Sequence, residues 1–121
     1  MLPSLIELLN HIQKEAIYLE KSTRSLAQAT FLTDEHLSRA FLRSLEIIGE
    51  ATKKLPLEFR QAYPQIQWKN MAGLRDKLIH DYFGVDYDLI WDILTDNIPE
   101  LNKNITWIIE DVKNGGYTPK I

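Results

Sequence analysis

The chain has 121 residues, of which 45% are hydrophobic and 26% are charged, and its formal net charge at pH 7 is −3. This composition is typical of one globular domain and excludes a disordered chain, while the acidic balance argues against a general nucleic-acid coat. Cysteine is absent, which excludes disulfides and thiolate zinc sites.

Neither a signal peptide nor a membrane span is expected. Charged residues such as Glu7 and Lys14 interrupt the N-terminal segment, and no small-residue cleavage site follows it. No stretch approaches the ~20 uninterrupted apolar residues that cross a bilayer. We therefore expect a soluble, cytoplasmic protein.

The first predicted helix begins at a capping box. Ser4 is followed three residues later by Glu7, and apolar residues then recur at helical spacing. This pattern predicts a helix that runs to about Lys21. Residues 22–33 are expected to be mostly connector.

The second predicted helix is strongly amphipathic. Asp34 is a suitable N-cap, and the helix should continue to Leu55, where a proline follows. One face is apolar, and the opposite face carries Arg39, Arg43, Glu46, Glu50, Lys53 and Lys54.

The stretch PLEFRQAYP predicts a short helix within residues 56–64, because proline suits a first turn and disfavours helix in the residue before it. A third main helix should begin near residues 67–69. It should end around residues 80–83, because Gly84 is a natural terminator.

The last predicted helix follows a cap at Asp86 and continues to Val112, and Pro99 must kink or break it. Two glycines at 115 and 116 then end regular structure. We therefore expect a domain over residues 1–114 and a flexible tail over residues 115–121.

These elements predict an all-α fold, an antiparallel bundle of four main helices plus a short helix, because no segment shows the alternation of a β-strand. Leu42 lies off the main apolar stripe of its helix, and the tryptophans offer more aromatic surface than a small monomer readily buries. A homodimer is therefore expected. The tryptophans are Trp68, Trp91 and Trp107.

Several classes of active site are disfavoured. No serine sits in a G-x-S-x-G turn, and no P-loop or dinucleotide fingerprint occurs. The histidines at 11, 36 and 80 are scattered and show no metal-ligand spacing. We expect neither a metal nor a cofactor.

One polar cluster remains as a candidate site: Arg75, Asp76, His80 and Tyr82. Asp76 and His80 are four residues apart, so on a helix the carboxylate could orient the imidazole and raise its pKa. Arg75 and His80 would lie roughly 140° apart on a regular helix. Their convergence needs local unwinding or a twofold-related copy across a dimer cleft.

Charge is unevenly distributed around this cluster. Residues 53–77 hold six basic and two acidic side chains, whereas residues 78–112 hold eight acidic side chains and one lysine. Lys69 and Lys77 could therefore supply nonspecific phosphate contacts. The alternative is a solvated surface with no binding role.

The run RDKLIHDYFG has the R-x4-H-x-Y pattern of the HEPN superfamily, and VDYDLIWDILTDNIPEL after it resembles the HepT toxins, once the family of unknown function numbered 86. FLRSLEIIGEATKKLP and WKNMAGLRDKLIH are similar to the second and third helices of the same family. The resemblance extends from about Leu5 to Val112. Asp76 departs from the pattern, because asparagine is frequent there.

The resemblance implies a HEPN fold and the toxin of a type VII toxin–antitoxin system, a metal-independent endonuclease acting on tRNA or mRNA. His80 would serve as general base or acid at the 2′-hydroxyl and the leaving oxygen, and Arg75 would stabilise charge on the phosphorane. Asp76 would support them.

The resemblance also implies control by covalent modification. The partner would be an MntA-type minimal nucleotidyltransferase antitoxin, which attaches AMP to Tyr82. Bulky, anionic AMP beside the catalytic pair would then exclude RNA by sterics and charge.

Each candidate residue also has a structural interpretation. His80 could cap a helix C-terminus, Arg75 could form a surface ion pair, and Tyr82 could be an aromatic at the core edge. Arg43 and Glu46 could be a solvated stripe or could support an active site in a dimer cleft.

The rival to a nuclease is a non-enzymatic helical module that binds nucleotide or a partner protein and carries Tyr82 as its modification site. A purely structural adaptor is a third reading. A substitution at His80 separates the enzyme from its rivals.

Overall fold

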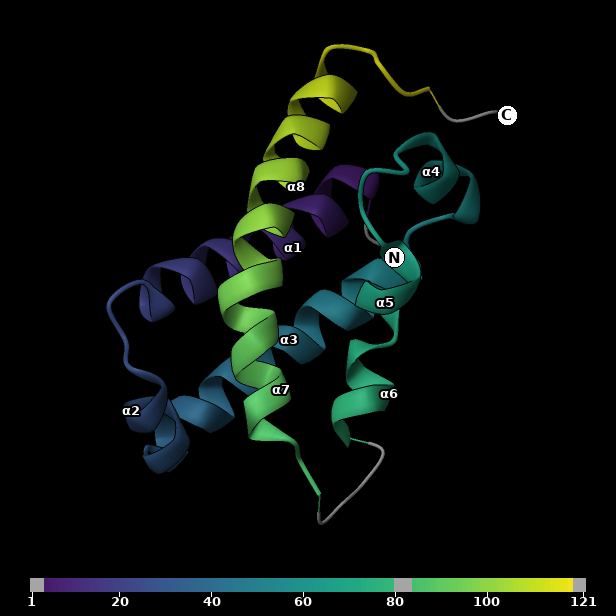
Figure 1. Ribbon diagram of the computed structural model, residues 1–121. Helices are drawn as coiled ribbons and strands as arrows, with labels where there is room; N and C mark the ends of the chain where they lie inside the picture. The colour runs from purple at the N-terminus through teal and green to yellow at the C-terminus, as the bar shows by residue number, and fades with distance from the viewer. Residues whose placement is uncertain (1–3, 80–83, 119–121) are drawn as a thin grey trace.

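The computed structural model describes residues 4–79 and 84–118, apart from the side chains of Arg75 and Ile79. Within this part of the chain every regular element is a helix, which confirms the predicted all-α class (Figure 1). In chain order the elements are α1 (Leu5–Thr23), α2 (Gln28–Thr33), α3 (Glu35–Lys54), α4 (Leu57–Ala62), α5 (Trp68–Ala72), α6 (Leu74–Ile79), α7 (Tyr87–Asp92), η1 (Ile93–Asn97) and α8 (Ile98–Lys113).

Side-chain caps fix where three of these helices begin, as predicted. The hydroxyl oxygen of Ser4 accepts from the backbone N–H of Glu7 at 3.1 Å, which caps α1. The carboxylate of Asp34 accepts from the backbone N–H of Leu37 at 3.0 Å, which caps α3. Asp86 caps α7 in the same way. Each cap satisfies a backbone donor that the helix leaves unpaired.

The core forms where α1 packs against both α3 and α8. In Figure 1 the long α7–η1–α8 rod crosses the pair α1 and α3. Each fully buried leucine or isoleucine contributes roughly 1.5–3 kcal/mol of transfer free energy. Fully buried side chains from the three helices are Leu9, Ile12, Leu19, Leu45, Ile48, Ile105 and Ile108.

The predicted connector contains the short helix α2, which the sequence analysis missed. Its Phe31 is fully buried and stacks on Phe41 of α3, with ring centroids 5.8 Å apart. The same ring lies 5.4 Å from that of Trp91 on α7. One buried aromatic thus holds this six-residue helix in place. The helix was not predicted because six residues are too few to show a helical period.

The predicted third main helix is two helices, which is a correction. It begins at Trp68 as predicted, but the chain turns at Gly73, with φ −80° and ψ −6°, before α6 starts. Trp68 is buried, and its indole N–H donates to the backbone carbonyl of Tyr63 at 2.8 Å. Since α5 and α6 each pack on α3, the turn lets both short helices reach the same neighbour.

A kink or a break was predicted at Pro99, and the structure shows that the last helix is not broken there. The turn before it widens into the π-helical segment η1, and the N–H of Ile98 bonds to the carbonyl of Ile93. Proline removes one backbone donor and crowds the carbonyl four residues earlier, and a wider turn accommodates that carbonyl. The chain therefore stays helical from Tyr87 to Lys113.

Helix α8 ends in a Schellman motif. Gly115 adopts φ +84°, and its N–H bonds to the carbonyl of Val112 at 3.1 Å. The N–H of Gly116 bonds to the carbonyl of Asp111 at 2.7 Å. These bonds satisfy the last carbonyls of the helix.

The segment after this motif lies against α4. The ring of Tyr117 is 5.1 Å from that of Phe59 and 6.4 Å from that of Tyr63. Tyr63 donates its phenol proton to Asp111 at 2.7 Å. Burial, followed by this hydrogen bond, raises the pKa of Tyr63 well above its usual value, so the phenol stays a donor.

The tryptophans supply less exposed aromatic surface than expected, because Trp68 is only 6% exposed and Trp91 is half-buried. Trp107 is 56% exposed. The aromatic surface that favoured a homodimer is therefore smaller than the sequence suggested, and the homodimer stays a prediction.

Gly115→Ala should lower the free energy of unfolding by about 1 kcal/mol, because a side chain with a Cβ is strained at positive φ. Urea denaturation at fixed protein concentration measures this loss. Gly115→Asn is the matched control, since asparagine tolerates the left-handed region, and it should recover most of the stability. Equal stability of the alanine variant and the parent would contradict the left-handed conformation of Gly115.

Candidate functional site

The predicted site is centred on helix α6. Its Leu74 and Leu78 are buried at 6% and 4% exposure, which fixes the helix against α3. The backbone of Arg75 belongs to this helix, and Asp76 follows it. His80 and Tyr82 lie outside the described residues, so the geometry of the predicted catalytic pair is not part of the structure.

Asp76 is held by an ion pair that the sequence analysis did not anticipate. The ammonium of Lys53 on α3 lies 3.2 Å from each carboxylate oxygen of Asp76. The two side chains are 41% and 72% exposed, so solvent screens the attraction. The pair joins residues 23 positions apart in the sequence, and no local pattern could have revealed it.

Arg43 and Glu46 form an ion pair with each other along α3, with nitrogen and oxygen 3.3 Å apart. Arg43 is 63% exposed and Glu46 is 19% exposed. Arg43 lies ten residues before Lys53, which corresponds to about 15 Å of helix rise. The structure thus places these predicted support residues on the helix that contacts α6, but well away from Asp76.

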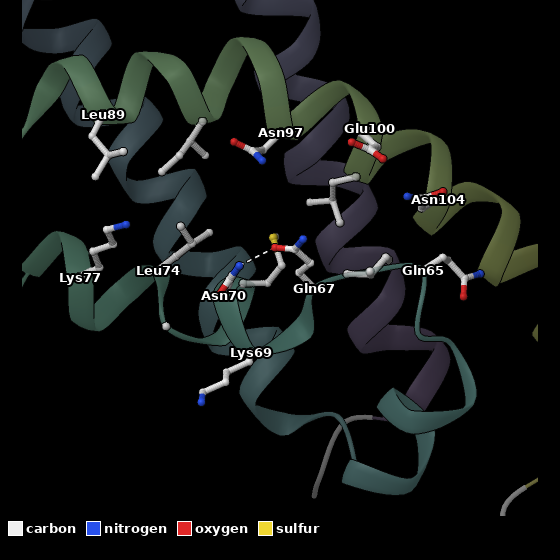
Figure 2. A pocket seen from close by; sticks show the side chains of 15 residues that line it. Gln65, Gln67, Lys69, Asn70, Leu74, Lys77, Leu89, Asn97, Glu100 and Asn104 are labelled. Atoms are coloured by element: carbon white, nitrogen blue, oxygen red, sulfur yellow. Dashed lines mark hydrogen bonds between the residues drawn. The ribbon is translucent and has the colours of Figure 1, made fainter.

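A groove with a volume of about 530 Å³ lies beside α6 (Figure 2). One wall comes from α5, α6 and the residues just before them, and the other comes from α7, η1 and α8. Its polar lining is rich in carboxamides and holds few charges. The polar side chains are Gln65, Gln67, Lys69, Asn70, Lys77, Asn97, Glu100 and Asn104.

The two lysines suggested for RNA contact both line this groove, but they point differently. In Figure 2 the side chain of Lys77 extends toward the wall that carries Leu89, whereas Lys69 extends away from the opposite wall. No carboxylate of the described residues lies within ion-pair distance of either ammonium. Both charges can therefore serve an anionic ligand.

Gln67 and Asn97 point into the space between the walls from opposite sides (Figure 2). Gln67 is tied down on its own wall, because its side-chain oxygen accepts a hydrogen bond from the carboxamide of Asn70. Neither residue was among the predicted site residues. Isolated amides carry no motif, and only the packing of the helices places these two in the same groove.

Within the described residues, no group of three or more histidine, aspartate or glutamate side chains is placed to hold a metal ion. The helices of residues 4–79 and 84–118 also include none with the length and apolar character of a membrane span.

Comparison with known proteins places residues 6–108 in the family described as HepT-like, ribonuclease HepT-like. A protein of Caldanaerobacter subterraneus subsp. tengcongensis named "Putative RNase" is 48% identical over 105 residues, which cover 87% of this chain and 94% of the relative. A "Putative RNase" of Methanocaldococcus jannaschii is 50% identical over 91 residues, 75% of each chain.

A third relative is named "Probable ribonuclease HepT" and comes from Thermococcus cleftensis. It is 48% identical over 88 residues, which cover 72% of this chain and 80% of the relative. No solved structure matches the chain.

A double-mutant cycle on Lys53→Ala and Asp76→Ala should give a coupling energy of less than about 1 kcal/mol, because the pair is exposed. Urea denaturation of the parent, both single variants and the double variant supplies the four free energies. Added salt should reduce the coupling further. A coupling above about 2 kcal/mol would show that the pair is more deeply shielded than its exposure indicates.

Proposed function

We propose that this chain, which belongs to the HepT-like ribonuclease family, is a metal-independent RNA endonuclease that cleaves with Arg75 and His80. The observation that carries the proposal is the R-x4-H-x-Y run of residues 75–82, which lies inside the family match to residues 6–108. The names of the relatives support ribonuclease activity at the level of the family.

The proposed reaction is a transfer within the RNA backbone. His80 takes the proton of a ribose 2′-hydroxyl, and the 2′-oxygen bonds to the adjacent phosphorus. The bond from phosphorus to the 5′-oxygen breaks, and that oxygen receives a proton. The products are a 2′,3′-cyclic phosphate and a 5′-hydroxyl, and water supplies no atom to this step. Arg75 stabilises the charge that develops on the phosphorane oxygens.

A homodimer completes this proposal. Arg75 and His80 would lie roughly 140° apart on a regular helix, so a single regular helix would not present both groups to one phosphate. A twofold axis would supply a second pair, with one imidazole as base and the other as acid. Arg43 and Glu46 would support such a cleft from α3, the helix on which α6 packs.

The RNA would approach along the basic side of α5 and α6. Lys69 and Lys77 carry no ion pair among the described residues and would contact phosphates. Asp76 would be a supporting polar group, because Lys53 offsets its charge and reduces its repulsion of phosphate.

We also propose that the chain is the toxin of a type VII toxin–antitoxin system, silenced by an MntA-type nucleotidyltransferase. In that reaction the phenol oxygen of Tyr82 bonds to the α-phosphorus of ATP, pyrophosphate leaves, and the phenol proton passes to solvent. The resulting phosphodiester adds bulk and negative charge next to the catalytic pair.

Unmodified protein should cleave total tRNA or mRNA in the presence of EDTA, and Arg75→Ala and His80→Ala should each lower the rate at least about 100-fold. Gel electrophoresis of end-labelled RNA measures the rates. Arg39→Ala and His36→Ala are the matched controls, because both residues are exposed on α3 outside the predicted site, and they should keep the parent rate.

No cleavage by the unmodified protein would favour the rival reading, a helical module that binds nucleotide or a partner. Cleavage that survives the substitution of His80 would also contradict the proposed chemistry. Cleavage that requires added metal would contradict the metal-independent mechanism.

Tyr82→Phe should leave the nuclease active but resistant to the antitoxin, because phenylalanine has no oxygen to receive AMP. Incubation with the nucleotidyltransferase and ATP, followed by mass spectrometry and a cleavage assay, tests both points. Tyr87→Phe is the control, since a tyrosine five residues away should not affect modification. An unchanged mass of the unsubstituted protein would reject AMP transfer.

A further inference from the structure

The reaction proposed above assigns no role to the groove beside α6. Its volume of about 530 Å³ lies within the roughly 300–1,000 Å³ of small-molecule pockets. Leu74 and Lys77 line it, so it adjoins the backbone of Arg75. A ligand in this groove would therefore lie beside α6, the helix that carries Arg75.

The groove has an apolar floor. Ile66, Leu74 and Leu101 line it and are anchored in the core at 5–6% exposure, and the half-buried Leu89 and Ile93 add apolar surface that a ligand can reach. Such a surface favours a flat group that loses little conformational entropy when it binds. An unpaired nucleobase has this shape, and the bases of single-stranded RNA are free to be splayed out.

Two carboxamides enter the groove from opposite walls. Gln67 points in from the α5 side and Asn97 from η1 (Figure 2). A carboxamide offers both a donor and an acceptor, as do the edges of nucleobases. Within the described part of the chain, neither the side-chain nitrogen of Gln67 nor the carboxamide of Asn97 has a hydrogen-bond partner, so both are available to a ligand.

Opposite charges on the two walls of the groove would orient a bound nucleotide. Lys77 lies on the α6 wall, and Glu100 lies on the α8 wall. A phosphate is attracted to the first and repelled by the second, so the sugar–phosphate backbone should follow α6 while the base points toward η1 and α8. This orientation places the base between the two carboxamides.

We propose that this groove is a subsite for one unpaired nucleotide of the RNA, with the base between Gln67 and Asn97 and a phosphate beside Lys77. The inference rests on the proposed ribonuclease function and deepens it. The subsite gives the protein a preference for one base in the RNA that it binds.

The test measures binding of fluorescent 2′-O-methyl oligonucleotides by anisotropy, using the full, unmodified chain. These oligonucleotides have no 2′-hydroxyl nucleophile, so the readout does not depend on cleavage. A set that varies one base in a constant unstructured sequence reports base preference. Gln67→Met and Asn97→Leu keep the size of each side chain while removing its donor and acceptor.

The unsubstituted protein should bind one base more tightly than the others, and each substitution should reduce that preference by roughly threefold to tenfold, the worth of a net hydrogen bond. Gln61→Met and Asn10→Leu make the same chemical changes at exposed helical positions outside the groove and should leave the preference intact. Lys77→Gln should weaken binding of all four sequences about equally.

Equal binding of all four bases by the unsubstituted protein would overturn the proposal, as would a preference that survives both groove substitutions. The competing role for the groove is a protein interface, and light scattering on the same samples tests it. If Gln67→Met or Asn97→Leu changes the oligomeric state while base preference persists, the groove is a protein interface. Since Gln67 is exposed, its variant tests the proposal even if Asn97→Leu does not fold.

The failure of this inference is distinguishable from failure of the nuclease proposal. Cleavage that depends on Arg75 and His80 but ignores the groove substitutions would reject the subsite alone. Base-selective binding by a protein that does not cleave would reject the nuclease and retain the subsite as part of a nucleotide-binding module.

Discussion

Helix α1 packs between α3 and α8, and this packing positions the shorter helices around it. Helices α5 and α6 contact α3, whereas η1 and α8 form the other side of the groove, and α1 touches both α3 and α8. The distance between the two groove walls is therefore set by side chains such as Leu9 and Ile12, which are fully buried in α1. A close-packed core transmits a change there to the walls, because such a core has no voids to absorb it.

Two local departures from regular helix shape the site. The turn at Gly73 separates α5 from α6, so that Trp68 and Leu74 are both buried although the two helices are short. The π-helical turn before Pro99 brings Asn97 to the groove without ending the helix. Such insertions are frequent at functional sites, because they redirect side chains without disrupting the backbone hydrogen bonds of the helices around them.

The electrostatics of the two walls match the proposed ligand. The helix that carries Arg75 also presents Lys77, and Asp76 beside it is compensated by Lys53 from α3. The opposite wall contributes Glu100 and neutral amides. An acidic protein can thus offer a local path to RNA, because phosphate responds to the charges within about a Debye length rather than to net charge.

The amino-acid sequence was enough to predict the helical class and the caps at Ser4, Asp34 and Asp86, because helical periodicity and capping are local properties. It also supplied the R-x4-H-x-Y run that led to the family. Three relations could not be predicted from the sequence: Phe31 anchors a helix, Lys53 binds Asp76, and Gln67 and Asn97 line the same groove. Those relations join residues far apart in the chain, and they arise only where the core holds the helices at fixed positions.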